Sequence, residues 1–88
     1  MGRRKAELFA SDQDLLNVLM YDLKGRLATP ATILSFLKEF YPEDTPKRVR
    51  TRLKALTSPV NQVCIINNVE VRDAKRGRET RYQVFDKN

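Results

Sequence analysis

The chain has 88 residues and carries 17 Lys and Arg against 11 Asp and Glu, a net charge of +6. This length suits one domain with a small core, and 41% hydrophobic with 32% charged residues suits a folded chain. No apolar run approaches the ~20 residues that a membrane span needs, and no apolar region follows the basic start as in a secretory signal. We therefore expect an intracellular protein with no membrane partner.

The composition also argues against catalysis and metal binding. The chain has no histidine, so it lacks an imidazole base and a zinc-ligand set. Cys64 is the sole cysteine, and its apolar neighbours predict a small core residue. The three glycines are scattered and form no phosphate-binding loop. We predict a protein that is not an enzyme and that has no cofactor, catalytic site or metal site.

The N-terminal part predicts a basic arm followed by a helix. Residues 1–10 form the expected flexible arm, and one domain is expected over residues 11–86. Ser11 and Asp14 have the spacing of a capping box, so a helix should begin there. Gly25 is placed to cap its C-terminus. The arm could follow a phosphate backbone or reach a minor groove through its three cations, Arg3, Arg4 and Lys5. The helix that follows the arm should bury four leucines: Leu15, Leu16, Leu19 and Leu23.

A second helix is predicted from Thr29-Pro30 to about Phe40. Thr is a suitable N-cap, and Pro fits the first helical position because the missing N–H costs nothing there. The turn 41–44 contains Pro42, which stops this helix and leads into the next. The expected apolar stripe of the second helix consists of Ile33, Leu34, Leu37 and Phe40.

A third helix is predicted over residues 45–58, again with a Thr-Pro start. Val49, Leu53 and Leu56 line one apolar stripe at i, i+4 and i+7. No acid lies in this segment, and five cations fall within eight residues: Lys47, Arg48, Arg50, Arg52 and Lys54. At about 100° per residue, Arg52 falls nearer the apolar stripe and the other four lie outward or beside it. Most charge runs are simply solvated, but this helix is also suited to bind a polyanion.

The C-terminal third has the pattern of strands. Residues 63–66 form an apolar run, Asn67-Asn68 suits a tight hairpin turn, and 69–72 alternate in polarity. A polar loop is expected over residues 73–79 and a further alternating strand over residues 80–85, with Tyr82 on its apolar face. These patterns predict two or three antiparallel strands whose last hairpin carries a cationic tip.

Charge is distributed unevenly along the chain. Residues 6–44 carry three cations and seven acids, whereas residues 45–88 carry eleven cations and four acids. The third helix and the last hairpin hold most of the positive charge. This asymmetry favours an acidic scaffold with one basic face, and hence a polyanionic partner.

The order of helix, helix, basic helix and β-hairpin with a cationic tip resembles the winged helix-turn-helix superfamily over residues 11–86. The resemblance implies an α+β fold, a three-helix winged helix-turn-helix domain with a two- or three-stranded C-terminal sheet. It implies a recognition helix over 45–58 for the DNA major groove and a wing over 73–80 for the backbone or minor groove. The turn with Pro42 and the extra hairpin near Asn67-Asn68 depart from the family pattern.

The resemblance assigns eight residues to double-stranded DNA binding: Lys47, Arg48, Arg50, Thr51, Lys54, Lys75, Arg76 and Arg78. Arg48 and Arg50 are candidates for base contact because Arg binds guanine bidentately, and Thr51 could contact a thymine methyl. The lysines, Arg76 and Arg78 are expected to contact phosphates, which gives salt-dependent affinity.

Three functions remain open at this point. The first is a sequence-specific DNA-binding regulator of transcription. The second is a non-specific nucleic-acid-binding module of a nucleoid, replication or RNA system. The third is a winged-helix module for protein interaction. A homodimer is favoured slightly over a monomer, with Phe9 and Phe85 as a small interface.

Overall fold

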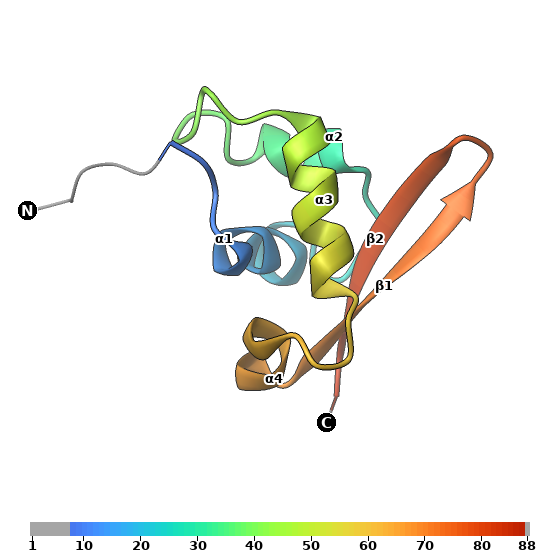
Figure 1. The fold of residues 1–88 in the computed structure, drawn as a ribbon. Coiled ribbons are helices and arrows are strands. Elements are labelled where there is room, and N and C mark those ends of the chain that lie inside the picture. The colour runs from blue at the N-terminus through green and yellow to red at the C-terminus, as the bar shows by residue number, and fades with distance from the viewer. Residues whose placement is uncertain (1–7, 88) are drawn as a thin grey trace, which may run out of the picture.

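The computed structural model describes residues 8–87. Arg3, Arg4 and Lys5 of the predicted arm lie outside the described residues. In chain order the elements are α1 (Asp12–Asn17), the π-helical segment η1 (Val18–Asp22), α2 (Pro30–Ser35), α3 (Pro46–Leu56), α4 (Gln62–Asn67), β1 (Val69–Arg76) and β2 (Glu79–Asp86). The helix α3 passes in front of α1 and α2, and the β1–β2 hairpin stands beside α3 (Figure 1). The protein is a small α+β domain with an antiparallel two-stranded sheet at its C-terminal end.

The core lies where the apolar faces of the helices and the sheet meet. The predicted stripe of α3 is confirmed, because Val49, Leu53 and Leu56 are all buried. Burial of one such side chain contributes about 1.5–3 kcal/mol. Tyr82 is buried on the inner face of the sheet, as its alternation predicted. The other main core residues are Leu15, Leu16, Leu19, Ile33, Leu34, Val71 and Val84.

The first helix begins as predicted and then widens. Ser11 Oγ accepts a hydrogen bond from the backbone N–H of Asp14, and Asp14 Oδ2 accepts one from the N–H of Ser11. From Val18 onward the helix becomes π-helical, and the N–H of Leu23 donates to the carbonyl of Val18 at 2.8 Å. This change of period leaves Leu23 partly exposed, although the sequence predicted it in the buried stripe. Gly25 has a φ of +80° in the turn that follows.

The second α-helix is shorter than expected. Thr29 and Pro30 begin it as predicted, but α2 ends at Ser35. The next turns use tighter i to i+3 hydrogen bonds, such as the bond from Phe40 N–H to the Leu37 carbonyl at 3.0 Å. The smaller number of residues per turn rotates Phe40 out of the stripe. Phe40 is 67% exposed, so its predicted core position is wrong.

The apolar run at residues 63–66 belongs to the helix α4, so the predicted strand and the hairpin turn after it are wrong. Asn61 Oδ1 accepts a hydrogen bond from the N–H of Cys64 and caps the helix, while Asn61 Nδ2 donates to the Ala55 carbonyl. Asn68 does adopt a positive φ of 57°, but it ends this helix instead of joining two strands. Cys64 is buried, as expected, from a helix instead of a strand.

The last hairpin extends further than expected. β1 and β2 are paired along their whole length, from Val69 opposite Asp86 to Arg76 opposite Glu79. The predicted loop 73–79 is therefore reduced to the two-residue turn Gly77-Arg78. Gly77 has a φ of +63°, and a positive φ at the first turn residue alone is the pattern of a type II′ turn.

The linker between the first two helical regions adds a short bridge to the sheet. The N–H of Ala28 donates to the Tyr82 carbonyl at 3.0 Å, and the N–H of Tyr82 donates back at 2.8 Å. β2 is therefore hydrogen-bonded on both sides. This bridge fixes the hairpin against the start of α2 and, through the core, beside α3.

Candidate nucleic-acid interface

The two flanks of helix α3 carry different arginines. Its N-terminus is fixed because Thr45 Oγ1 accepts a hydrogen bond from the N–H of Arg48 at 3.2 Å. The buried stripe faces the core and leaves the opposite face in solvent. Arg48 and Arg52 lie on one side of this outer face, and Arg50 lies on the other side. The structure therefore divides the cations that the sequence placed together.

Arg48 is held by a buried carboxylate. Its Nε donates to Asp44 Oδ1 at 2.7 Å, and its Nη2 donates to Asp44 Oδ2 at 2.9 Å and to the Ala10 carbonyl at 2.7 Å. Its guanidinium also lies over the ring of Phe9, 5.1 Å from the centroid. We call this cluster of Ala10, Asp44 and Arg48 the Asp44 clasp. It connects the start of α3 to the segment that precedes α1.

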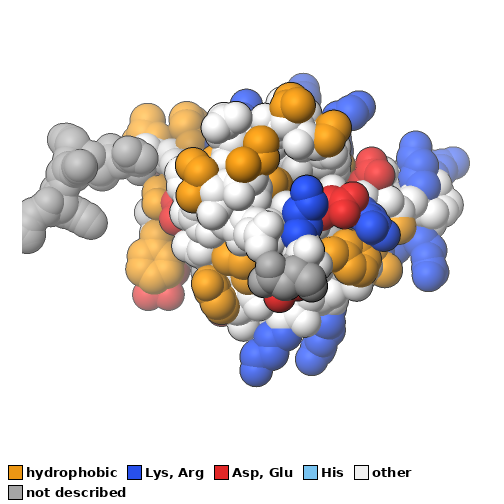
Figure 2. Space-filling view, turned by 90° about the horizontal axis from the view of Figure 1, so that it is seen from below, with side chains coloured by type: hydrophobic (Ala, Val, Ile, Leu, Met, Phe, Trp, Pro, Cys, Tyr) orange, Lys and Arg blue, Asp and Glu red, His pale blue; other side chains and the backbone are white. Residues whose placement is uncertain are grey.

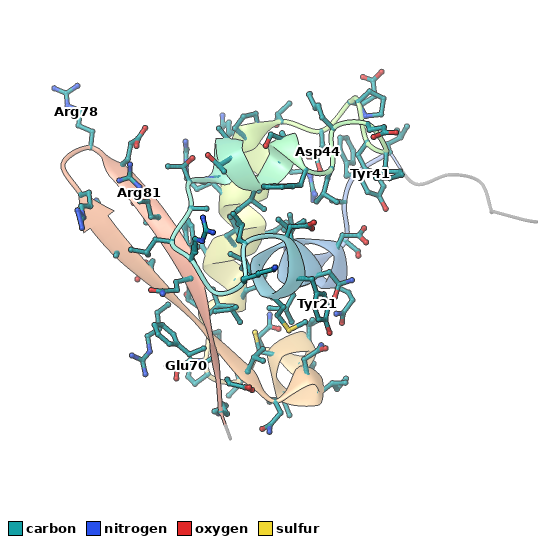
Figure 3. All side chains as sticks on the ribbon, turned by 180° about the vertical axis from the view of Figure 1, so that it is seen from behind. Tyr21, Tyr41, Asp44, Glu70, Arg78 and Arg81 are labelled. Atoms are coloured by element: carbon teal, nitrogen blue, oxygen red, sulfur yellow. The ribbon has the colours of Figure 1, made fainter. Side chains whose placement is uncertain are left out.

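The Asp44 carboxylate is fully buried, and both of its oxygens accept hydrogen bonds. It also accepts hydrogen bonds from the backbone N–H groups of Ala10 and Thr45, at 3.0 and 2.9 Å. Burial by itself raises the pKa of Asp44, but the bonds from Arg48, Ala10 and Thr45 outweigh this effect and hold the pKa below its ordinary value. The hydrogen bond to Asp44 raises the pKa of Arg48. Figure 3 shows Asp44 beside Tyr41, away from the hairpin tip with Arg78.

Arg52 connects α3 to α1. Its Nε and Nη2 donate to the two oxygens of Asp12 at 2.9 and 2.8 Å. The hydrogen bond from Arg52 to Asp12 is the main reason that the pKa of Arg52 is raised. Arg52, which the helical period placed nearer the apolar stripe, therefore joins α3 to α1 through an ion pair.

On the other flank, α3 faces the hairpin across a groove. Two adjoining hollows lie between them, and Arg50 and Thr80 line both. Lys54 and Lys75 line one hollow, and Arg78 lines the other. We call this feature the α3–hairpin groove, defined by Arg50, Lys54, Lys75, Arg78 and Thr80. Asp73 also lines it, and so does Glu79, whose carboxylate is paired with Arg81.

The hairpin register explains which of its cations belong to the groove. Lys75 is opposite Thr80 and lies on the face that carries the buried Tyr82. Arg76 is opposite Glu79, so it lies on the other face of the strand. Arg78 occupies the turn and projects at the tip of the hairpin (Figure 3). The structure therefore brings Lys75 and Arg78 to Arg50 but turns Arg76 away.

Tyr82 forms the floor of the groove. Burial raises the pKa of its hydroxyl, the charge of Asp73 raises it further, and the charge of Arg50 opposes this shift. Asp73 of the hairpin and Arg50 of α3 therefore both lie close enough to the Tyr82 hydroxyl to affect its pKa. Lys47, Arg50, Thr51 and Lys54 are all exposed along α3, and within residues 8–87 the three cations of this set form no ion pair.

Two threonines that the sequence did not single out as site residues contribute to the groove, although Thr80 lies in the predicted wing 73–80. Thr29, the cap of α2, and Thr80 of β2 line it beside Arg50. Their hydroxyls could donate hydrogen bonds to phosphate oxygens. The helix-cap pattern located Thr29 but gave no sign that it would lie near α3, since the Ala28 bridge brings it there.

The described part of the chain contains neither a candidate metal site nor a candidate membrane-spanning helix. Residues 8–87 contain no group of three acid or cysteine side chains arranged to hold a metal ion. Within the same residues, no helix is long and apolar enough to cross a membrane. No family model, curated protein or solved structure matches this chain.

Proposed function

We propose that this protein is a winged helix-turn-helix DNA-binding protein that recognises a specific sequence and regulates transcription. The main support is the α3–hairpin groove. Two basic clusters, 25 residues apart in sequence between Arg50 and Lys75, face each other across it. Solvation alone does not explain this convergence, because repulsion among like charges favours their separation.

In this proposal α3 enters the major groove through its exposed face. Arg50 contacts base edges, because its guanidinium forms no ion pair with a carboxylate of residues 8–87 and can bind guanine O6 and N7 together. Lys47 and Lys54 lie along the helix on either side of Thr51 and contact phosphates. Arg48 has a different role: its guanidinium holds Asp44 and so orients α3 instead of reading a base.

The hairpin supplies the second set of contacts. Lys75 and Arg78 lie beside Arg50, so DNA held by α3 would meet them along its backbone. Thr29 and Thr80 can donate hydrogen bonds to the same phosphate oxygens. The rigid pairing of β1 and β2 reduces the conformational entropy lost when these cations bind.

The test is fluorescence-anisotropy binding to a mixed pool of short DNA duplexes at several salt concentrations, followed by sequencing of the bound fraction. We expect salt-dependent binding and enrichment of one sequence. Binding without enrichment would contradict sequence-specific recognition and support a nucleoid, replication or RNA module. Absence of binding at low salt would contradict nucleic-acid recognition and favour a protein partner.

A further inference from the structure

The α3–hairpin groove contains an acidic side chain whose charge is not balanced by an ion pair. Of the two acids that line the groove, Glu79 is paired with Arg81, with 3.4 Å between Glu79 Oε1 and Arg81 Nη2. Asp73 forms no ion pair within residues 8–87, and it is exposed to solvent. In Figure 2 the hairpin end of the molecule, on the right, carries several basic side chains with acidic ones near them. Among the described residues, Asp73 is therefore an unpaired negative charge in a mostly basic groove.

The strand register directs Asp73 toward α3. Asp73 is opposite Tyr82 and Lys75 is opposite Thr80, so these four side chains share one face of the hairpin. One hollow of the groove is lined by these four hairpin residues together with two cations of α3: Arg50 and Lys54. We call it the Tyr82 hollow. An anion that enters this hollow therefore meets three cations and one carboxylate.

The charge of Asp73 acts inside the Tyr82 hollow. Burial is the main cause that raises the pKa of the Tyr82 hydroxyl, the charge of Asp73 raises it further, and the charge of Arg50 lowers it. The carboxylate of Asp73 and the guanidinium of Arg50 therefore lie near the same hydroxyl, one on the hairpin and the other on α3. A phosphate placed between them is attracted by Arg50 and repelled by Asp73.

We propose that Asp73 is a specificity-determining residue of the groove, because its carboxylate repels phosphate from the Tyr82 hollow. The inference rests on the proposed DNA-binding function and adds a group that acts against the wrong DNA. Non-specific binding depends almost entirely on contacts with phosphates. An unpaired charge that opposes a competing partner is one of the two ways in which a protein gains specificity.

The repulsion affects the two kinds of complex unequally. On the preferred sequence Arg50 reaches a guanine, and base edges carry no net charge, so Asp73 opposes this contact little. The amino group of a neighbouring cytosine can even donate a hydrogen bond to a carboxylate. On random DNA no guanine lies at the required position, so Arg50 and the two lysines of the hollow are left to bind phosphates. Asp73 opposes those contacts, and it therefore weakens random binding more than specific binding.

The test is replacement of Asp73 by Asn, which keeps the size of the side chain and removes its charge. Fluorescence anisotropy measures the affinity for the selected duplex and for a scrambled duplex over a series of salt concentrations. Affinity for the scrambled duplex should rise by about three- to tenfold, and its salt slope should become steeper by about 0.9 for each added phosphate contact. Affinity for the selected duplex should rise by about twofold or less, so the ratio of the two affinities falls. Damage to the fold would instead weaken binding, and circular dichroism verifies that the fold persists.

Asp86→Asn is the matched control. It removes the same charge from an exposed position of the same hairpin, at the end opposite the tip, where Asp86 is paired with Val69. The control should leave the ratio of the two affinities unchanged. Equal effects of the two substitutions would overturn the inference, because net charge alone would then explain them.

The wild type separates failure of the inference from failure of the proposed function. A wild type that prefers the selected duplex, together with an Asp73→Asn variant of unchanged or lower affinity for the scrambled duplex, would overturn the role of Asp73 alone. A wild type that binds neither duplex, or binds both equally, would overturn the proposed function and the role of Asp73 with it.

Discussion

At the scale of single residues, the protein assigns different roles to arginines that look equivalent in the sequence. Arg48 and Arg50 flank the same outer face of α3, two residues apart. The first is bound by Asp44 and the Ala10 carbonyl, and the second lines both hollows of the groove. The difference follows from which neighbour each flank of α3 faces.

Replacement of Arg50 by Ala should weaken binding to a preferred DNA sequence by about 1–3 kcal/mol, because it removes a bidentate base contact. Affinity for random DNA should fall less. Anisotropy titrations with the selected duplex and a scrambled duplex measure both losses. Arg52→Ala is a suitable control because Arg52 is bound to Asp12, so its loss should lower stability with little change in specificity. Equal losses on both duplexes for Arg50→Ala would exclude a base contact.

Replacement of Asp44 by Asn should lower the free energy of unfolding by about 1–3 kcal/mol near neutral pH. The fully buried carboxylate accepts bonds from one side chain and two backbone N–H groups, and an amide cannot replace them all. Urea unfolding followed by circular dichroism measures the change. A variant as stable as the wild type would contradict the structural role of the clasp.

The contribution of Asp44 should also depend on pH. Its pKa is lowered in the folded state from an ordinary value of 3.8. Its stabilising effect is therefore complete above that ordinary value and is lost as pH falls through the lower folded value. Urea midpoints of wild type and Asp44→Asn should converge as pH decreases below about 4. A constant difference down to pH 2 would show that ionisation of Asp44 is not the cause.

At the scale of elements, the hairpin offers a direct comparison of two neighbouring cations. Lys75 lies on the groove side of β1 and Arg76 lies on the opposite face, as their pairing with Thr80 and Glu79 requires. Lys75→Ala should therefore weaken binding to all duplexes and lower the salt slope by about one. Arg76→Ala should have a smaller effect on both. A larger effect of Arg76 would indicate that DNA contacts the other face of the hairpin.

The helix α4 shows why element type is hard to predict from a short apolar run. Four apolar residues in succession suit a buried strand or part of a buried helix equally well by periodicity. The structure forms a helix because Asn61 caps it and also binds the Ala55 carbonyl, while Cys64 packs into the core. The Asn61 cap is local, but the bond to Ala55 and the packing of Cys64 join α4 to other elements, and local pattern could not indicate those two contacts.

At the scale of the whole molecule, five exposed cations lie along α3 and the α3–hairpin groove: Lys47, Arg50, Lys54, Lys75 and Arg78. Salt dependence should report how many of these cations bind phosphates, at a slope of about −0.9 per phosphate. If the exposed cations of α3 and the groove all bind, log K against log salt should have a slope of about −4 to −5. Anisotropy over a series of salt concentrations measures it. A slope near zero would contradict binding by these five residues: Lys47, Arg50, Lys54, Lys75 and Arg78.

Much of the fold could be predicted from local signals. The caps at Ser11, Thr29 and Thr45, the buried stripe of α3 and the last strand all depend on residues close in sequence. The end of α2, the widening of the first helix and the identity of α4 could not be predicted in this way. Each depends on a change of hydrogen-bond period or on a contact between distant residues.

The sequence by itself determined where the helices begin, which faces are apolar and where positive charge accumulates. Caps, periodicity and composition act over a few residues, so they can be read along the chain. Only the tertiary structure decided which cations share a surface. The Asp44 clasp and Asp12 bind Arg48 and Arg52, and the strand register turns Lys75 toward Arg50 and Arg76 away. Ion pairs and strand pairing join residues that are distant in sequence, and they exist only once the core has brought the elements together.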